Sequence, residues 1–428
     1  MNRAMRKFYN RFCIHLFCCC LLIVTACQHM PAQANLFKPV PVDTVDGANY
    51  AADTLVFDID SSNLKDFFVK FNNVVKSGQG NISILHIGGS HVQAGTFSHR
   101  IRRNILLSCP DMITSRGIIF PYSAAPKCNN PSDYRVKKNG SYTLIRSVFL
   151  PHPKPLGASG IAVYTADSAA TITIKMNDKD LNFATNRLTL IGYPEDTACI
   201  LPTLIVAGKE YEPVEYSKVT RRYIYQIPDT RDSFLIKLNT TGKNGTFVVT
   251  GILLENMDKP GITIHSIGVN GARVDSYLNC INFDEDLELI TPDLVIFGIG
   301  INDAMGDAFD TVAFERKYLE LAAKFRAVNP DCAFIFLTNN DSFNKSGKKY
   351  YVNKNGELAR RAFYRIAQKT NGAVWDQFAI MGGLTSMDKW RIAGYAQTDR
   401  VHFTTQGYNL LGDLFFNAFI DAKNKCLK

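Results

Sequence analysis

Four short polar blocks in this chain each follow an apolar run that is expected to form a strand. The blocks are Gly88-Gly89-Ser90-His91, Gly268-Val269-Asn270-Gly271, Gly300-Ile301-Asn302-Asp303 and Asp399-Arg400-Val401-His402. In open parallel sheets, reactive groups gather where loops leave the carboxyl ends of the strands. We therefore expect the four blocks to meet at one edge of a sheet.

The residue types in these blocks suit nucleophilic catalysis. A serine hydroxyl is a poor nucleophile until an imidazole takes its proton, and that imidazole needs a partner that fixes its tautomer. Ser90 is the candidate nucleophile, His402 the base and Asp399 its partner, because the Asp-x-x-His spacing brings carboxylate and ring together. Plainer interpretations exist for single residues, such as a helix N-cap for Ser90 and a surface loop position for His402.

The order of these residues carries a resemblance to a known family. Ser90, Gly271, Asn302 and His402 match, in order, the Ser, Gly, Asn and His blocks of the SGNH (GDSL-type) hydrolases, which are serine esterases. The resemblance covers about residues 55–130 and 260–428. It implies an oxyanion hole made by the backbone N–H groups of Ser90 and Gly271 and the side-chain amide of Asn302.

One position departs from the family pattern. The family usually has Gly-Asp-Ser at the nucleophile, whereas this chain has Gly88-Gly89-Ser90. A carboxylate at position 89 would brace the nucleophile loop, and here it is missing. This leaves two interpretations, an enzyme with an intact triad and weaker positioning, or a protein that has lost its activity.

Alternating strand and helix patterns are expected to hold the four blocks in place. An amphipathic helix at 63–76 precedes an apolar strand at 82–87, which ends at the first block. After Gly261 the rhythm predicts a parallel sheet. Its expected strands lie at 262–267, 294–297 and 333–337, and its expected helices at 312–326, 357–369 and 408–422. The fold class is therefore α/β, and the resemblance implies a flavodoxin-like three-layer α/β/α domain.

The middle of the chain, residues 134–258, has a different pattern. Short runs of β-branched and aromatic residues recur between turn residues, with no convincing helix among them. The runs lie at 161–164, 171–174, 187–191, 204–206, 222–227, 234–238 and 247–254. Strands at this spacing predict an antiparallel β-sandwich, here inserted between hydrolase parts at 55–133 and 259–428.

Within the family, the chain is most similar to the peptidoglycan and polysaccharide O-acetylesterases, in which a β-sandwich resembling a carbohydrate-binding module interrupts the catalytic domain. The similarity is carried by the Gly-Ser-His-Val-Gln-Ala-Gly run at 89–95, the insert, and Met381-Gly382-Gly383 with Trp390. It implies an acetylated glycan as substrate. Trp390 is either a platform for a sugar ring or, like Trp375, a packing residue. An O-acetyltransferase and a non-catalytic glycan-binding lipoprotein are the alternatives.

The N-terminus carries an export signal. Basic residues precede an apolar stretch from Cys13 to Ala26, which predicts a signal peptide over residues 1–26. The sequence Val24-Thr25-Ala26-Cys27 resembles a bacterial lipobox, so Cys27 is expected to carry lipid and residues 27–54 to form a flexible tether. Cleavage after Ala34 is the alternative. We expect an exported, membrane-anchored bacterial lipoprotein at the periplasmic face or the cell surface.

Composition and the remaining motifs exclude other classes. The formal net charge is +9, but four basic residues lie in the leader and no Lys/Arg-rich run follows, so nucleic-acid binding is not expected. The G-x-S-x-G elbow, the G-x-G-x-x-G loop and the H-E-x-x-H motif are all missing. His86, His91 and His99 have no matching set of cysteines or carboxylates nearby in sequence. We expect no metal and no cofactor.

Overall fold

The computed structural model describes most of the chain beyond its leader. It describes residues 37–428 except positions 61, 110, 111, 113, 114, 127, 179, 180, 182, 196–200, 218, 241–244, 259, 260 and 307. The predicted signal peptide and the lipidation site Cys27 lie outside the described residues. No helix of the described part is long and apolar enough to cross a membrane.

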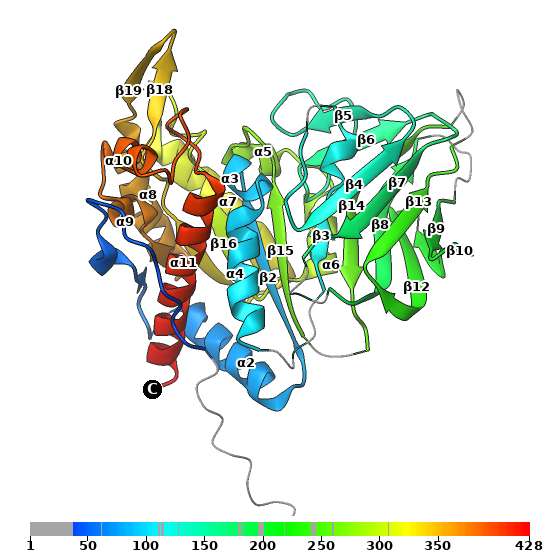
Figure 1. Ribbon diagram of the computed structural model, residues 1–428, viewed down its shortest axis with the longest axis horizontal. Coiled ribbons are helices and arrows are strands. Elements are labelled where there is room, and N and C mark those ends of the chain that lie inside the picture. Colours follow the sequence, from blue (N-terminus) through cyan, green and yellow to red (C-terminus); the bar gives the residue numbers. More distant parts are fainter. Residues whose placement is uncertain are drawn as a thin grey trace, which may run out of the picture. The chain divides into compact units, whose positions relative to one another are not determined.

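A parallel sheet forms the centre of the hydrolase part (Figure 1). Its strand order is β1-β20-β17-β16-β2-β15, and all neighbours are parallel except β1, which pairs antiparallel with β20. The strands are β1 (Leu55–Val56), β2 (Asn81–Gly88), β15 (Gly261–Gly268), β16 (Leu294–Gly298), β17 (Ala333–Leu337) and β20 (Ala373–Trp375). In chain order the five parallel strands lie 2-1-3-4-5, the flavodoxin order. The predicted fold class is confirmed.

Two groups of helices cover this sheet, each turning its apolar residues inward (Figure 1). The first group is α2 (Asn63–Ser77), α4 (Thr96–Leu107) and α11 (Thr405–Cys426), which pack against one another. The second is α5 (Val274–Leu278), α6 (Phe283–Ile290), α7 (Thr311–Val328) and α8 (Asn355–Lys369). Short helices α9 (Gln377–Met381) and α10 (Ser386–Ile392) follow the last parallel strand.

The segment after Ser90 forms two helices rather than one. A short helix, α3 (Ser90–Gln93), ends before Gly95, and α4 then starts in a new direction. Gly95 has φ of +76°, and a Cβ there would lie 2.4 Å from Cβ of Pro131. Only glycine fits both constraints. The nucleophile block therefore sits on a helix of a single turn rather than on a long one.

The insert is built from two antiparallel sheets, as the short β-rich runs predict. One sheet has the order β10-β9-β13-β7-β4, and the other contains β11-β12-β8-β14-β6-β5 with β3 paired to β14. The strands are β3 (Gly117–Ile119), β4 (Tyr134–Asn139), β5 (Thr143–Arg146), β6 (Ile161–Thr165), β7 (Thr171–Met176), β8 (Thr185–Pro194), β9 (Thr203–Val206), β10 (Lys209–Tyr211), β11 (Glu215–Ser217), β12 (Arg222–Arg231), β13 (Ser233–Lys237) and β14 (Phe247–Glu255). Strand β3 was not expected, and it brings the first hydrolase segment into the insert's sheet.

A buried cluster of charges lies where the insert meets the hydrolase part. Arg102 of α4 donates two hydrogen bonds, of 3.1 and 2.6 Å, to the carbonyl of Ile264 in β15, and it also pairs with Asp133 just before β4. Arg116 pairs with the same carboxylate. Burial acts to raise the pKa of Asp133, but the two guanidinium groups outweigh it and lower the pKa to about 2. The ionised carboxylate of Asp133 thus bridges both arginines where the insert meets the hydrolase part.

Residues 38–54 differ from the prediction of a flexible tether. The backbone of Val40 exchanges two hydrogen bonds with the side-chain amide of Asn417 in α11, at 2.8 and 2.9 Å. Further along, Asp53 accepts a hydrogen bond of 2.9 Å from the indole of Trp375, and Val45 is buried. These contacts fix the segment against the hydrolase part, because its polar backbone finds specific partners there. Packed structure therefore begins by Lys38, not near Leu55.

A hairpin that the sequence patterns did not reveal projects from the hydrolase part near the top of Figure 1. Strand β18 (Phe343–Ser346) pairs antiparallel with β19 (Lys349–Val352) across a turn at Gly347 and Lys348. Gly347 has φ of +60°, the left-handed conformation that such turns require. The hairpin leaves the sheet shortly after β17, on the side where the reactive blocks lie.

Candidate active site

Ser90 lies at the topological switch point of the parallel sheet. Strand β2 runs between β15 and β16, and Ser90 is the first residue of α3 directly after it. The end of β2 packs closely against β16. A Cβ built at Gly88 would lie 2.3 Å from the carbonyl oxygen of Gly298, so there is no room for a side chain at this position. The hydroxyl of Tyr277 also donates a hydrogen bond of 2.7 Å to the carbonyl of Gly88. Switch points of this kind are where open α/β sheets bind their ligands.

His402 connects Ser90 with Asp399. The Nε2 atom of His402 lies 2.7 Å from Oγ of Ser90, and its Nδ1 atom lies 2.7 Å from Oδ2 of Asp399. Because an ionised carboxylate can only accept, Nδ1 carries the proton and Nε2 presents its lone pair to the serine hydroxyl. The three residues predicted to act together from the sequence thus form one continuous hydrogen-bonded chain.

The carboxylate of Asp399 is kept ionised by its own loop. Its Oδ1 atom accepts hydrogen bonds from the backbone N–H groups of Val401 and His402, at 2.9 and 3.0 Å. Partial burial acts to raise the pKa of Asp399, but the side chain of His402 and these two backbone donors outweigh it and lower the pKa to about 2. The carboxylate therefore remains charged at any pH near neutrality.

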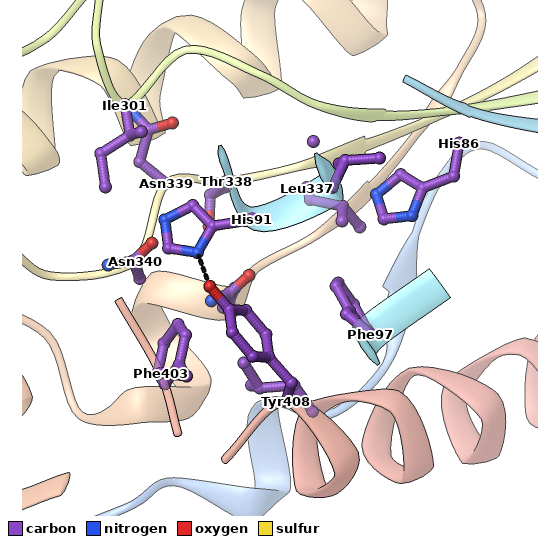
Figure 2. A pocket seen from close by; sticks show the side chains of 14 residues that line it. His86, His91, Phe97, Ile301, Leu337, Thr338, Asn339, Asn340, Phe403 and Tyr408 are labelled. Atoms are coloured by element: carbon purple, nitrogen blue, oxygen red, sulfur yellow. Dashed lines mark hydrogen bonds between the residues drawn. The ribbon is translucent and has the colours of Figure 1, made fainter. Parts of the chain in front are cut away.

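His91, the residue after the nucleophile, supports the base from the side. Its ring centroid lies 5.1 Å from that of His402, and its Nδ1 atom lies 2.8 Å from the hydroxyl of Tyr408 in α11 (Figure 2). Burial lowers the pKa of His91 to about 3, and the neighbouring His402 acts in the same direction. A neutral His91 puts no positive charge beside His402 when that base becomes protonated.

A small cavity with a mixed polar and apolar lining lies next to His91 (Figure 2). It has a volume of about 30 Å³, and its lining includes His86, His91, Thr338 and Asn339. The Nε2 atoms of both histidines and the Nδ2 atom of Asn339 are buried without a protein partner among the described residues. A space of this size has room for about one water molecule, which would give these three polar atoms a hydrogen-bond partner.

The second block forms a tight turn beside the nucleophile. The N–H of Ala272 donates to the carbonyl of Val269 at 2.9 Å, and Gly271 has φ of +85°, as the third residue of a type II turn requires. That turn leaves the N–H of Gly271 unused. The N–H of Ser90, at the start of α3, likewise has no carbonyl within its helix to bond. Both donors are available to an oxygen atom of a bound ester.

Asn302, from the third block, lies next to the same turn. Its Nδ2 atom donates a hydrogen bond of 2.9 Å to the carbonyl of Ala272, and a Cβ built at Gly89 would lie 3.4 Å from that Nδ2 atom. The amide is thus placed between the nucleophile block and the Gly271 turn. Among the described residues, one of its two N–H groups has no partner and can bond a ligand.

Two residues whose role the sequence did not reveal hold this turn in place. Oε1 of Gln93 accepts a hydrogen bond of 2.7 Å from the N–H of Asn270, and Asp303 accepts from the N–H of Val274 with both oxygens at 3.3 Å. Burial raises the pKa of Asp303 to about 7, although the Val274 hydrogen bond opposes the shift. Neither role has a signal in the sequence, because the partners are 177 and 29 residues away.

Trp390 is a packing residue, so the alternative of a sugar platform is wrong. Trp390 and Trp375 are both 0% exposed. The indole of Trp390 donates a hydrogen bond of 3.2 Å to the carbonyl of Met381, and its ring packs against Tyr395 and Phe403. Trp390 therefore lies inside the protein and packs beneath the end of the loop that contains His402.

The histidines near the nucleophile have structural partners. Nδ1 of His86 lies 2.8 Å from Oγ of Ser98, and Nε2 of His99 lies 2.7 Å from Asp178. Within the described ranges, no group of three or more His, Cys, Asp or Glu residues is placed to hold a metal ion. The chemistry available from the described side chains at this edge is that of a serine nucleophile with an imidazole base.

Comparisons with known proteins agree with this geometry. The model of the GDSL-like lipase/acylhydrolase family matches residues 232–410, a span that contains Gly271, Asn302, Asp399 and His402 but not Ser90. No curated protein matches the chain. A solved structure of a peptidoglycan O-acetylesterase is 20% identical and superposes with a TM-score of 0.70, covering 87% of this chain and 99% of that one. At this identity the likeness is one of fold.

Two other solved structures overlap less well. An acetyl xylan esterase is 20% identical, with a TM-score of 0.30, and the match covers 38% of this chain and 82% of that one. A family two carbohydrate esterase from Cellvibrio japonicus is 9% identical, with a TM-score of 0.28, and the match covers 68% of this chain and 100% of that one.

Proposed function

We propose that this chain is an esterase of the GDSL-like lipase/acylhydrolase family, whose model matches residues 232–410, and that it removes O-acetyl groups from a cell-wall or extracellular glycan. Ser90, His402 and Asp399 are the proposed catalytic triad. The observation that carries the proposal is the hydrogen-bonded chain from Ser90 Oγ through His402 to Asp399 at the switch point of the sheet. A nucleophile, a base and a group that orients the base are the parts that acyl transfer needs.

The first half of the proposed reaction makes an acetyl-enzyme. Nε2 of His402 takes the proton of the Ser90 hydroxyl as Oγ attacks the carbonyl carbon of the acetyl ester. The carbonyl electron pair moves to its oxygen, which receives hydrogen bonds from the N–H groups of Ser90 and Gly271 and from the Asn302 amide. When this intermediate collapses, the bond to the sugar oxygen breaks and His402 returns its proton to that oxygen. The sugar hydroxyl leaves, and acetyl-Ser90 remains.

The second half releases acetate. His402, now neutral again, takes a proton from a water molecule as the water oxygen attacks the acetyl carbon of acetyl-Ser90. Collapse breaks the bond to Ser90 Oγ, which recovers its proton from His402. Asp399 stays ionised in both halves and balances the charge of the imidazolium each time it forms.

A glycan ester is the proposed substrate because of the fold and of what lies beside the site. The fold is that of a peptidoglycan O-acetylesterase, and an acetyl ester needs little room for its acyl group. The insert reaches the turn that contains Gly271. Val148, which follows β5, lies beside that glycine, because a Cβ built at Gly271 would be 3.8 Å from Cγ1 of Val148. Phe149 and Leu150 next to it are 63% and 65% exposed. Exposed apolar groups beside a polar site suit the apolar faces of sugar rings.

Export completes the proposal. Cleavage of the signal peptide before Cys27 and lipidation of that cysteine would anchor the enzyme to a membrane, at the periplasmic face or the cell surface. Cell-wall and extracellular glycans are found in those places. Metabolic labelling with a fatty-acid probe should mark the wild-type protein and not the Cys27→Ser variant.

The test of the activity is acetate release. We would assay p-nitrophenyl acetate and O-acetylated peptidoglycan or xylan with wild type, Ser90→Ala and His402→Ala. Each variant should lose on the order of 10⁴-fold or more in kcat. Ser108→Ala and His152→Ala, which change the same residue types elsewhere, should keep wild-type rates. A wild-type protein that binds the glycan but releases no acetate would overturn the esterase assignment at this site.

A further inference from the structure

We propose that the β18–β19 hairpin is a cationic subsite that binds carboxylate groups of the glycan next to the scissile ester. The inference rests on the proposed function and narrows it, because it makes the substrate an acidic glycan rather than a neutral one. The argument starts from the charges on the hairpin and then follows its contacts back to the loop that holds His402.

The hairpin concentrates positive charge without any acid to balance it. Residues 343–354 contain four lysines and neither Asp nor Glu. All four lysines are exposed, and none has an ion-pair partner among the described residues; they are Lys345, Lys348, Lys349 and Lys354. By contrast, Lys317 and Lys324 on α7 pair with Asp275 and Asp284. The charge of the hairpin is therefore left available to a ligand.

The root of the hairpin touches both sides of the active site. The N–H of Phe343 donates a hydrogen bond of 3.1 Å to the carbonyl of Arg400, which lies between Asp399 and His402. On the other side, Oδ1 of Asn344 accepts a hydrogen bond of 3.4 Å from Gly306, in the loop that follows Asn302. The hairpin thus stands at the edge of the site, anchored to the loop of the base and to the loop of the oxyanion donor.

One face of the hairpin carries a row of cationic and aromatic side chains outward from the catalytic loop, in which Arg400 is ion-paired with Asp388 and Lys345 is not paired with any described acid. Arg400 stacks on the ring of Tyr350, with its guanidinium carbon 4.4 Å from the ring centroid. Lys345 is paired with Tyr350 across the two strands, and its Nζ atom lies 5.7 Å from the same centroid. Because directly opposite residues share a face of a hairpin, Arg400, Tyr350 and Lys345 form a row that leads away from His402.

These cations attract anions by charge, and the anions expected on the proposed glycan substrate are carboxylates. An exposed ammonium group is a compact point charge with three rotating donors that attracts any nearby anion, whereas an arginine fork grips carboxylate or phosphate through two parallel bonds. The hairpin itself has lysines and no arginine. Lys345, Lys348 and Lys349 lie within two residues of the turn at Gly347 and Lys348, so they present several like charges to an approaching anion. Sugar acids and peptide substituents supply such carboxylates in glycans.

The experiment measures binding and turnover separately. The affinity of a fluorescently labelled, de-O-acetylated peptidoglycan fragment is measured at low and high salt for the wild type and for the Lys345→Gln/Lys348→Gln/Lys349→Gln triple variant. The control variant Lys65→Gln/Lys76→Gln/Lys428→Gln removes the same charge from α2 and the C-terminus, at the opposite end of the hydrolase part in Figure 1. We expect the hairpin variant to bind about tenfold more weakly at low salt and to lose most of its salt dependence. The control variant should bind like wild type.

A second substrate separates charge recognition from a general effect. When the carboxylates of the fragment are converted to amides, wild type and hairpin variant should bind it equally. Equal affinity of hairpin and control variants for the acidic fragment, or no effect of amidation on wild type, would overturn the inference. The rate on p-nitrophenyl acetate should be unchanged in the hairpin variant, which shows that the triad is intact. If wild type fails to hydrolyse any ester, the proposed function falls, while the binding comparison still decides the role of the hairpin.

Discussion

The two halves of the active site are built in different ways. In the half that holds the base, Asp399 and His402 are three residues apart, and their loop supplies most of the hydrogen bonds that fix them. In the half that holds the proposed oxyanion donors, Gly271 and Asn302 come from separate loops and are fixed by Gln93 and Asp303 from two different segments. The first half is a local structure, whereas the second depends on the sheet being assembled.

This difference predicts how each half responds to change. A local loop keeps its geometry when distant residues change, so only its own functional groups are sensitive. A site assembled from several loops depends on each cross-link between them. Four substitutions test the comparison, from the largest expected effect to the smallest.

Asp399→Asn should have the largest effect. An amide at this position offers N–H groups to Nδ1 of His402, which favours the tautomer that no longer accepts the proton of Ser90. We expect kcat on p-nitrophenyl acetate to fall by roughly 10³–10⁴-fold at every pH from 5 to 9, because the carboxylate is ionised throughout that range in wild type. Asp229→Asn, on the surface of the insert, is the control. A loss confined to low pH would contradict this view of the base half.

Asn302→Ala should have the next largest effect. Removing one oxyanion donor typically costs about 10²–10³-fold in kcat, and KM should change little because the donor acts on charge that develops in the transition state. Steady-state kinetics on p-nitrophenyl acetate measure both constants, with Asn256→Ala as the control. If KM rises while kcat is kept, Asn302 binds the ground state instead and the assignment of the oxyanion half is wrong.

Asp303→Asn should change how stability depends on pH. Burial raises the pKa of Asp303 from about 4 to about 7, so the folded protein holds a proton here that the unfolded chain gives up. This site therefore makes the folded state less stable as the pH rises from about 4 to 7. The amide cannot ionise but can still accept a hydrogen bond from Val274, so the variant should have a Tm a few degrees above wild type at pH 8 and equal to it near pH 4. A difference in Tm that is the same at both pH values would contradict the role of Asp303.

Gly89→Asp, which restores the usual family residue, should have the smallest effect. Gly89 has φ of −93°, which any residue can adopt, and a Cβ there would make an ordinary contact of 3.4 Å with Asn302. We expect the variant to fold and to keep kcat within about fivefold of wild type. Gly88→Ala is the contrast, because its Cβ would overlap the carbonyl of Gly298 and should lower the Tm strongly. Loss of folding in both variants would show that the nucleophile block has no spare room.

The sequence was sufficient for the features that local patterns encode. The parallel strands β2, β15 and β16 are mostly apolar runs that end in glycine. The insert's strands alternate, as in β7, where Ile172, Ile174 and Met176 are buried. The Asp-x-x-His block is local as well, so the proximity of Asp399 to His402 could be inferred from spacing. These features do not depend on knowing which segments meet in the fold.

The features that were missed all depend on partners far away in sequence. Residues 38–54 are polar and aperiodic, and nothing in them shows that Asn417 will pair with Val40. Strand β3 has only three residues and gains its partner from β14. The β18–β19 hairpin has lysines where strands usually have apolar residues, although its Ser346-Gly347 pair is a turn signal. Tertiary contacts decided these elements, not local preference.

The packed start of the chain sets a limit on where a lipid-anchored enzyme can work. Eleven residue steps separate the proposed lipid at Cys27 from Lys38, where packing begins, and eleven fully extended residues span at most roughly 40 Å. A tether that lasted to residue 54 would allow a reach of roughly 90 Å or more. With the shorter connection, the proposed anchor would hold the enzyme close to the membrane, so that it would act only on the glycan layer nearest that membrane. Acetyl groups on glycan that lies deeper in the wall would then have been removed only earlier, when that glycan was still at the membrane surface.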